Sequence, residues 1–351
     1  MQKYYAVGIM SGTSLDGLDL IFCKYTYTNS WTFEIIKAAT ISYDKNWKEQ
    51  LKNAESISGI ALTKLHKSYG RVIGEKINHF LKDIKEKPDI IASHGHTVFH
   101  QPEQKITLQI GDGAEIASVT GVTTISDFRA LDVALGGQGA PLVPIGDELL
   151  FHDYDYCLNI GGFSNISTKK NNKRIAFDIC PANIVLNQLA NNLNKPFDKD
   201  GKLAKSGKTD RKLLQGLNQI DFYRLPYPKS LGKEWVDNQF ISVLNKSGLS
   251  IYDKLNTLYE HISDQITNTI SGNPSKKVLV TGGGAYNKYL IERVKAKTKA
   301  QIIIPSKNII EYKEALIFGL LGVLRFNRKI NCLSTVTGAK INSSTGIIHI
   351  I

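Results

Sequence analysis

Apolar and polar side chains alternate near the start of the chain as they do in a β-hairpin. Residues 5–10 form a short apolar run, and residues 11–14 read Ser-Gly-Thr-Ser. Apolar side chains then occupy every second position from Leu18 to Phe22. This order of strand, turn and strand predicts a hairpin. The same order returns at residues 156–167, which predicts a second hairpin and an internal repeat.

Other segments show helical spacing or short buried runs. Apolar side chains recur every three to four residues between positions 56 and 85, which predicts one or two helices. Residues 90–93 and 277–280 are apolar runs that predict buried strands, and a helix is expected to follow the second run through Leu290 and Val294. Residues 314–325 are almost wholly apolar, which predicts a helix buried between layers.

The length and composition indicate a globular protein with two domains. The chain has 351 residues, of which 42% are hydrophobic and 22% are charged, and domains usually have roughly 100–200 residues. We predict an α/β fold in which two similar αβ lobes face a cleft. Residues 1–128 and 327–351 are expected in the N-terminal lobe, and residues 129–326 in the C-terminal lobe.

The charge and the cysteines narrow the class of protein. The net charge is +12, but most basic residues are lysines that occur singly, without the arginine forks and clustered aromatic side chains typical of nucleic-acid recognition. No apolar run approaches the ~20 residues of a membrane span. The four cysteines show no C-x-x-C spacing, and the first residues do not resemble a signal peptide. We predict a cytoplasmic protein that binds neither nucleic acid nor membrane.

Three glycine-containing turns could bring backbone N–H groups close to phosphate. They lie at residues 12–17, 160–165 and 282–284, and glycine permits this close approach. None matches a P-loop or a dinucleotide fingerprint, so each alone is compatible with an ordinary turn. Equivalent turns in both halves are what a nucleotide held from two sides requires, and the third turn suits the adenosine. The carboxylate of Asp16 is suited to bind a magnesium ion, either directly or through the waters of that ion.

Asp178 follows an apolar run at a predicted strand end. A carboxylate there can accept a proton from a hydroxyl group or a water, as phosphoryl transfer to an alcohol requires. The alternative is that Asp178 caps a helix that begins near Pro181.

A polar, glycine-rich segment at residues 126–141 is predicted to cross between the halves. Arg129 in this segment could bind a substrate carboxylate, or it could form an interdomain salt bridge. His94, His96 and His100 are close in sequence, but their spacing does not match a helical zinc pair or a Cys/His set. We therefore expect no metal on these histidines.

Ordered motifs along the chain resemble those of the anhydro-N-acetylmuramic acid kinase family, within the sugar kinase, Hsp70 and actin superfamily. The resemblance runs from residue 8 to residue 339. It rests on Gly8–Gly17, Ser93-His94-Gly95-His96-Thr97, Gln109-Ile110-Gly111-Asp112-Gly113, Asp127-Phe128-Arg129, Gly136-Gly137-Gln138-Gly139-Ala140-Pro141-Leu142, Asn159-Ile160-Gly161-Gly162, Pro228-Lys229-Ser230 and Glu314-Ala315.

The resemblance implies a two-lobed, actin-like or ribonuclease H-like ATPase fold and a specific reaction. ATP would phosphorylate O6 of 1,6-anhydro-N-acetylmuramic acid while water opens the anhydro bridge, which gives N-acetylmuramic acid 6-phosphate and ADP in peptidoglycan recycling. The family uses Mg²⁺ with ATP and is commonly a homodimer. Asp178 matches its catalytic aspartate, which would deprotonate the water.

The other site residues also follow from the resemblance and the turns. Sugar contacts are expected at Thr97, Arg129, Gln138 and Glu314. ATP contacts are expected at Gly12, Thr13, Ser14, Leu15, Asp16, Gly17, Leu18, Asp19, Gly161, Gly162, Gly283 and Gly284. The magnesium ligands are left open.

The sequence departs from the family pattern beside the catalytic carboxylate. The family's Asp-Thr-Gly-Pro-Gly-Asn is replaced here by Asp178-Ile179-Cys180-Pro181-Ala182-Asn183, and the two added Cβ atoms could shift the loop or the substrate. His96 replaces a usual Gln, and Phe163-Ser164 replaces Ile-Ala. Two other functions remain open: a related kinase of an unbridged amino sugar, and a nucleotide-binding regulatory or chaperone-like module.

Overall fold

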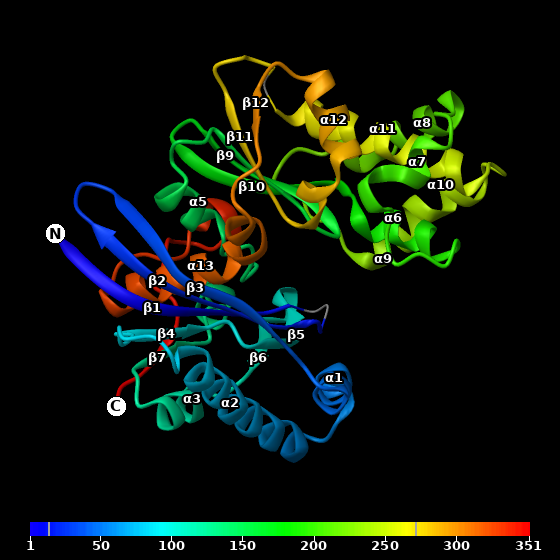
Figure 1. Cartoon of the computed structure of the whole chain (residues 1–351). Helices are drawn as coiled ribbons and strands as arrows, with labels where there is room; N and C mark the ends of the chain where they lie inside the picture. Colours follow the sequence, from blue (N-terminus) through cyan, green and yellow to red (C-terminus); the bar gives the residue numbers. More distant parts are fainter. Residues whose placement is uncertain (13–14, 271) are drawn as a thin grey trace. The chain divides into compact units, whose positions relative to one another are not determined.

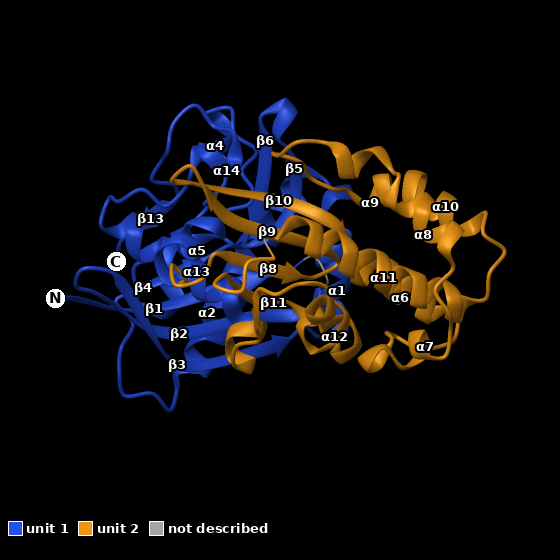
Figure 2. Ribbon diagram, turned by 90° about the horizontal axis from the view of Figure 1, so that it is seen from above, with its two compact units in different colours: residues 1–150, 312–351 blue, residues 151–311 orange. Residues whose placement is uncertain are grey.

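The computed structural model describes residues 1–12, 15–270 and 272–351. These residues form two compact units, which Figure 2 shows in blue and orange. Unit 1 contains residues 1–150 and 312–351, and unit 2 contains residues 151–311. No helix in the described ranges has the length and apolar character that a bilayer span requires.

Unit 1 is built on a mixed six-stranded sheet with the order β13-β7-β4-β1-β2-β3. The predicted first hairpin is confirmed: β1 (Gln2–Ser11) and β2 (Gly17–Tyr27) are antiparallel, and Ser11 pairs with Leu18. β3 (Trp31–Ser42) extends this meander (Figure 1). The predicted strand β4 (Ile90–Ser93) is buried and lies parallel to β1. The sheet ends with β7 (Thr124–Ser126) and β13 (Ile347–His349).

Helices cover both faces of this sheet (Figure 1). The predicted helix α2 (Gly59–Leu81) packs with Val7 and Ile9 in a core that includes its own residues Tyr69 and Ile73. α13 (Lys307–Phe326) crosses the opposite face, where a Cβ on Gly8 would collide with Ala315 O and lie 2.7 Å from Gly319 N. The prediction of a buried helix at 314–325 is therefore confirmed.

The remaining elements of unit 1 are short. They are α1 (Lys45–Lys52), the 3-10 helix Ala54–Ser56, β5 (His96–Gln101), the 3-10 helix Pro102–Gln104, β6 (Ile106–Ile110), α3 (Gly113–Thr120), α4 (Ala130–Ala134), α5 (Pro144–Leu150) and α14 (Ser334–Thr337). β5 and β6 form a separate two-stranded sheet.

Unit 2 contains a five-stranded sheet with the order β10-β9-β8-β11-β12. The second predicted hairpin is confirmed as β8 (Tyr156–Ile160) and β9 (Phe163–Lys170), which are antiparallel. β10 (Lys173–Pro181) pairs with β9. β11 (Lys277–Thr281) and β12 (Gln301–Ile303) run parallel to β8 on its other side.

Helices of unit 2 pack on the sheet face that carries Leu158, Ile166 and Val280. The long helix α11 (Ile251–Thr269) contributes Leu255, Leu258 and Ile262 to that core. The other helical elements are α6 (Asn183–Asn191), Lys199–Gly201, α7 (Lys202–Lys205), α8 (Arg211–Asn218), η4 (Asp221–Arg224), α9 (Lys233–Trp235), Val236–Phe240, α10 (Ile241–Asn245), η6 (Gly283–Tyr286) and the predicted α12 (Lys288–Lys297).

The two sheets share one connectivity. In unit 1, three antiparallel strands β3-β2-β1 are followed by the parallel strands β4 and β7. In unit 2, β10-β9-β8 are followed in the same way by β11 and β12. The predicted α/β fold with two similar αβ lobes of the actin-like, ribonuclease H-like type is therefore confirmed.

The units divide at 150/151 and 311/312, whereas the sequence predicted divisions at 128/129 and 326/327. The difference has a physical cause in each case. Arg129 donates a hydrogen bond to His94, which follows β4, so the segment after residue 128 belongs with unit 1. Most of α13 packs on the unit 1 sheet through residues such as Ala315 and Gly319.

Candidate active site

In unit 2, two of the predicted glycine turns lie at the same edge of the sheet. β8 and β11 are parallel neighbours with Thr281 opposite Asn159, so their carboxyl ends lie side by side. The turn after β8 contains Gly161 and Gly162, and the turn after β11 contains residues 282–284. A Cβ on Gly282 would lie 2.6 Å from Asn159 Oδ1 and 2.7 Å from Ile160 O, which shows how closely the two turns pack.

The glycines in these turns have two different environments. A Cβ on Gly162 or Gly283 would find no protein atom closer than 3.9 Å, and one on Gly161 none closer than 3.4 Å. A Cβ on Gly284 would collide with Ile160 Cγ2. Packing within unit 2 therefore explains Gly284, but it does not explain the absence of a side chain at Gly161, Gly162 and Gly283.

The turn after β8 also supports the start of α6. Gly162 O accepts hydrogen bonds from the N–H groups of Ala182 (2.8 Å) and Ile184 (3.1 Å), and Gly161 O accepts one from Asn183 (3.1 Å). Backbone carbonyls thus satisfy N–H groups that a helix start leaves without intrahelical partners. Ala182 is the N-cap of α6 and makes no side-chain cap. The alternative role of Asp178 as a helix cap is therefore wrong.

Asp178 is held at an irregular point of β10. The register between β10 and β9 shifts between Asp178 and Cys180. The Asp178 N–H donates to Lys229 O (3.0 Å), and the Leu231 N–H donates to Asp178 Oδ2 (2.7 Å). Partial burial raises the pKa of Asp178, and the Leu231 N–H opposes this rise. A carboxylate with a raised pKa is a better proton acceptor than an ordinary aspartate.

Asp178 belongs to a row of polar residues that crosses four strands. The register places Asp178 opposite Asn165, Asn165 opposite Asn159, and Asn159 opposite Thr281. Because successive side chains of a strand alternate between faces, this row lies on the face opposite the helices. The row ends at the Gly282 turn. The sequence alone indicated no role for Asn159 or Asn165. Both lie in the segment around the Gly161–Gly162 turn, but only strand pairing shows that they align with Asp178.

The unusual residues after Asp178 occupy the interior of unit 2. Ile179, Cys180 and Ala182 are all buried in the hydrophobic core. Burial also raises the pKa of the Cys180 thiol well above its ordinary value. These side chains therefore replace smaller groups inside the core and do not lie in the polar row.

In unit 1, the β1–β2 hairpin places the predicted nucleotide residues in several environments. Gly12 is half-buried and Asp16 is exposed. Gly17 and Leu18 are buried, and Leu18 packs in the core against α2, so its side chain is not at a ligand-facing surface. Asp19 accepts a hydrogen bond from Thr40 Oγ1 (2.6 Å). Leu15 has a φ of 58°; Thr13 and Ser14 lie outside the described residues.

Three buried hydroxyl groups support the end of β1, next to this loop. Ser11 Oγ is 2.8 Å from Tyr43 Oη and 3.0 Å from Tyr69 Oη. The two tyrosine hydroxyls also contact each other. The cluster joins β1 to α2 and to the residue after β3, so it holds the start of the loop.

Arg129 lies within unit 1 and is bound by polar groups of the same unit. Its Nε–H donates to His94 Nε2 (2.9 Å), and Nη1 donates to Gly139 O. His94 Nδ1 lies 2.8 Å from Gly95 O, so Nδ1 carries the hydrogen and Nε2 is the acceptor. Burial and the Arg129 charge hold the pKa of His94 well below its usual value, which keeps it neutral. Burial lowers the pKa of Arg129 to about 10.

The other predicted sugar contacts lie in the same unit. Gln138 is exposed beside Gly139, and Thr97 on β5 is half-buried and accepts from Gln109 Nε2 (3.4 Å). Glu314 on α13 is accessible to solvent. Nearby protein groups nevertheless remove enough water to raise the pKa of Glu314, while the Arg129 charge lowers it. Arg129 and Glu314 are therefore close enough to affect each other's charge.

Asp132 organises the loop that carries Gln138, and the sequence reasoning did not single it out. This buried carboxylate accepts hydrogen bonds from the Gly139 N–H (2.8 Å), Thr337 Oγ1 (2.7 Å) and Cys332 Sγ (3.1 Å). The only hint in the sequence was that Asp132 lies three residues after Arg129. The partners are far away in sequence, so only the structure identifies the role.

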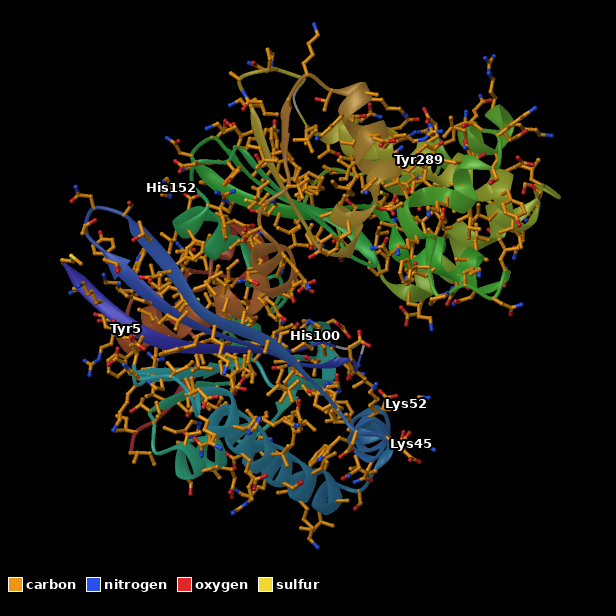
Figure 3. The ribbon with its side chains drawn as sticks, in the orientation of Figure 1. Tyr5, Lys45, Lys52, His100, His152 and Tyr289 are labelled. Atoms are coloured by element: carbon orange, nitrogen blue, oxygen red, sulfur yellow. The ribbon has the colours of Figure 1, made fainter. Side chains whose placement is uncertain are left out.

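The three neighbouring histidines have separate partners. His94 binds Arg129, and His96 Nδ1 lies 3.5 Å from Ser11 Oγ. His100, which Figure 3 labels, is exposed on β5. Its Nδ1 lies 3.1 Å from Thr107 Oγ1. Within the described part of the chain, no group of three or more His, Cys, Asp or Glu side chains is arranged to hold a metal ion.

Comparison with known proteins agrees with the motifs. Residues 3–350 match the family described as anhydro-N-acetylmuramic acid kinase. The chain belongs to this kinase family. It is 35% identical over 374 residues to the anhydro-N-acetylmuramic acid kinase of Aliivibrio fischeri, with 99% of each chain covered. It is 34% identical over 367 residues to the kinase of that name from Vibrio cholerae, with 98% of this chain and 97% of the relative covered.

Solved structures with similar folds are more distant from this anhydro-N-acetylmuramic acid kinase family member. One is the activator of the 2-hydroxyisocaproyl-CoA dehydratase from Clostridium difficile with bound ADPNP, with a TM-score of 0.45, 14% identity, and coverage of 91% of this chain and 94% of that chain. Another is a ROK family glucokinase from Streptomyces griseus in complex with glucose and AMPPNP, with a TM-score of 0.41, 10% identity, and coverage of 91% and 99%.

Proposed function

We propose that the chain uses ATP to phosphorylate O6 of 1,6-anhydro-N-acetylmuramic acid while water opens the anhydro bridge, as a step of peptidoglycan recycling. Membership of the kinase family supports the choice of substrate. The observation that carries the chemistry is Asp178: a carboxylate of raised pKa, fixed by the Leu231 N–H, in a polar row that ends at glycine turns.

Asp178 acts in this mechanism as the proton acceptor. It takes a proton from water, and the water oxygen forms a bond to C1 of the sugar as the C1–O6 bond breaks. The electron pair of that bond passes to O6, which bonds to the γ-phosphorus of ATP, and ADP leaves. The Leu231 N–H keeps Asp178 Oδ2 in place, so the other carboxylate oxygen remains to accept the proton.

The turns of unit 2 and the hairpin of unit 1 are proposed to contact ATP. The space beside Gly161, Gly162 and Gly283 supports the nucleotide assignment in unit 2. In the hairpin, the proposed contacts are Gly12, Thr13, Ser14, Leu15, Gly17 and Asp19, with Leu18 limited to its backbone.

Mg²⁺ fits the oxygen donors of the same hairpin, because the Asp16 side chain is exposed and carboxylates suit this hard cation. Mg²⁺ would neutralise phosphate charge. Asp16 would hold it directly or through water, and Asp19, fixed by Thr40, supplies a second carboxylate in the hairpin.

Four residues of unit 1 are proposed to bind the sugar: Thr97, Arg129, Gln138 and Glu314. Arg129 is the strongest of these candidates, because His94 and Gly139 O orient its guanidinium through Nε and Nη1. Among the described residues, Nη2 has no hydrogen-bond acceptor, so it can bind the carboxylate of the muramic acid side chain.

The reaction itself is tested with ¹⁸O-labelled water. Mass spectrometry of the product is expected to show one ¹⁸O atom at C1 together with one phosphate at O6. Unbridged N-acetylmuramic acid serves as the comparison substrate. A phosphorylated product without ¹⁸O, or faster turnover of the unbridged sugar, would contradict the proposed reaction.

The role of Asp178 is tested by Asp178→Asn. The asparagine can still accept the Leu231 hydrogen bond, so the fold and ATP binding are expected to survive, while turnover falls by about 10²–10⁴-fold. Asp237→Asn, a change at an exposed carboxylate of the same unit, is the control. Turnover of Asp178→Asn within a few-fold of the unchanged enzyme would rule out Asp178 as the base.

We also propose that the protein acts in the cytoplasm as a homodimer, on the basis of the family resemblance. Sedimentation of the purified chain tests the dimer. A single species at the mass of one chain would contradict it.

A further inference from the structure

Unit 2 contains a pocket of about 320 Å³ on the helix-covered side of β10. The pocket is lined by Phe177 and Ile179 of β10, by Gln265 of α11, by Asn218 at the end of α8, and by Lys229 in the loop after η4. The volume lies in the usual range for small-molecule sites, ~300–1,000 Å³. The polar row occupies the opposite face of the same strand, so this pocket is separate from the residues assigned to the reaction. We name it the β10 pocket.

A buried hydrogen-bond network fixes the polar part of the β10 pocket. Asn218 Oδ1 accepts from His261 Nδ1 (2.6 Å) and from Gln265 Nε2 (2.9 Å). His261 Nε2 then accepts from Tyr223 Oη (2.8 Å), another lining residue. Burial lowers the pKa of His261 to about 3, so the network stays neutral. Within the described chain Gln265 Oε1 has no hydrogen-bond partner, which leaves an acceptor for a ligand hydroxyl group.

The charged side chains that line the β10 pocket are both basic. Lys229 Nζ donates to Phe222 O (3.1 Å) and lies 4.6 Å from the centre of the Phe222 ring. Arg224 is exposed, and its carboxylate neighbour Asp221 is 3.6 Å away and almost fully exposed, so this ion pair is weak. The nearby Asp264 is engaged by Lys297. Two basic groups beside amides and hydroxyls suit a small anion that carries hydroxyl groups.

The loop that supplies Lys229 also holds Asp178. Lys229 O accepts from the Asp178 N–H, and Leu231, two residues later, donates to Asp178 Oδ2. Phe177 and Ile179, the chain neighbours of Asp178, line the pocket directly. A ligand that engages Lys229 therefore acts on a segment that contacts the carboxylate through two hydrogen bonds.

We propose that the β10 pocket binds a small hydroxylated organic anion, a phosphate or a carboxylate, and that this ligand inhibits turnover through the Lys229–Leu231 segment. The inhibitory part rests on the proposed role of Asp178; the binding part does not. A negative charge behind β10 disfavours the ionised form of a nearby carboxylate. The ligand is therefore expected to make Asp178 a poorer proton acceptor at low pH.

Binding is tested by calorimetry with glucose 6-phosphate, gluconate and glucose. At least one of the two anions is expected to bind, and glucose to bind at least tenfold more weakly. Which anion binds distinguishes a phosphate from a carboxylate ligand. Arg224→Gln and Asn268→Ala are expected to weaken anion binding about tenfold, because each removes a lining group. Arg211→Gln, at an exposed arginine of α8 outside the pocket, is the matched control.

Other variants separate this site from the proposed active site. Arg129→Gln is expected to bind the same anion with unchanged affinity. Asp178→Asn is expected to bind it at least as tightly, because the repulsion between the anion and the Asp178 carboxylate is reciprocal. Binding that Arg129→Gln abolishes and Arg224→Gln preserves would place the anion in unit 1 and overturn the proposal. The absence of anion binding to the unchanged protein would also overturn it. These results hold whether or not the chain phosphorylates the anhydro sugar.

Inhibition is tested by turnover against pH, with and without a saturating amount of the bound anion. The anion is expected to lower turnover several-fold and to move the acidic limb of the profile to higher pH. Arg224→Gln is expected to keep the basal turnover and to lose the effect at the same anion concentration. Binding with an unchanged profile would overturn the inhibitory part.

Discussion

Gly283 and Gly284 are adjacent, but their replacement by alanine is expected to change different properties. Gly283→Ala should weaken ATP binding, and Gly284→Ala should lower the thermal stability. A Cβ on Gly283 lies 3.9 Å from the nearest protein atom, Asn183 Nδ2. A Cβ on Gly284 collides with Ile160 Cγ2 and lies 2.7 Å from Ile160 Cβ and 3.1 Å from Ile160 O. The first methyl group enters the space that we assign to ATP, and the second enters the packed core of unit 2.

The sizes of the expected changes in Tm and KM follow from these two environments. Overpacking of a core costs about 1–3 kcal/mol, and each kcal/mol lowers Tm by roughly 2–4 °C for a folded unit of 150–250 residues. Gly284→Ala should therefore lower Tm by about 2–12 °C. Gly283→Ala meets no clash and restricts the unfolded chain, which stabilises by about 0.4–1 kcal/mol. Its Tm should be unchanged or slightly higher, while its KM for ATP rises at least about tenfold, or ~1.4 kcal/mol.

Thermal denaturation and steady-state kinetics with varied ATP measure both effects. Gly272→Ala is the control, because a Cβ at this exposed position meets nothing within 4 Å, so it also causes no clash, and it lies outside the proposed site. A KM for ATP in Gly283→Ala equal to that of the control would show that the space beside Gly283 is not used by the nucleotide. A Tm in Gly284→Ala equal to that of the unchanged enzyme would refute the packing argument.

Three further predictions concern unit 1 and the buried histidines. Arg129→Lys should raise the KM for the sugar about tenfold with little change in Tm. The reason is that lysine cannot donate to His94, Gly139 O and a carboxylate in the same fork geometry. An unchanged KM would show that Arg129 does not bind the sugar. Gly8→Ala should lower the free energy of unfolding, measured in urea titrations, by about 3 kcal/mol or more. The added methyl group would collide with backbone atoms of α13, which cannot move aside as a side chain can. An unchanged urea midpoint would contradict this. The free energy of unfolding should also fall as the pH drops below about 6.5, because His261, with a pKa of about 3, stays neutral when folded but binds a proton when unfolded. Protonation of His261 in the unfolded chain should alone lower the free energy of unfolding by about 1.7 kcal/mol between pH 6.5 and pH 5. If a His261→Asn variant kept the full pH dependence, the effect would have to come from other groups.

Much of the fold could be predicted from local patterns. The alternation at residues 5–22 and 156–167 predicted both hairpins, and the apolar run at residues 314–325 predicted the buried helix α13. These signals are local because strand alternation and helix spacing are set by neighbours in the chain. The boundaries between the two units could not be predicted from local patterns, because they depend on the packing of α13 against β1.

The sequence by itself determined which side chains are available for chemistry and that the hairpin pattern occurs twice. It could not determine that Asn159, Asn165 and Asp178 form one row, because strand register arises from pairing between distant segments. It could not separate Gly283 from Gly284, since only the tertiary structure places Ile160 beside one and open space beside the other. The same holds for the β10 pocket: its lining residues come from β10, α8, α11 and the loop at Lys229, and folding alone brings them together.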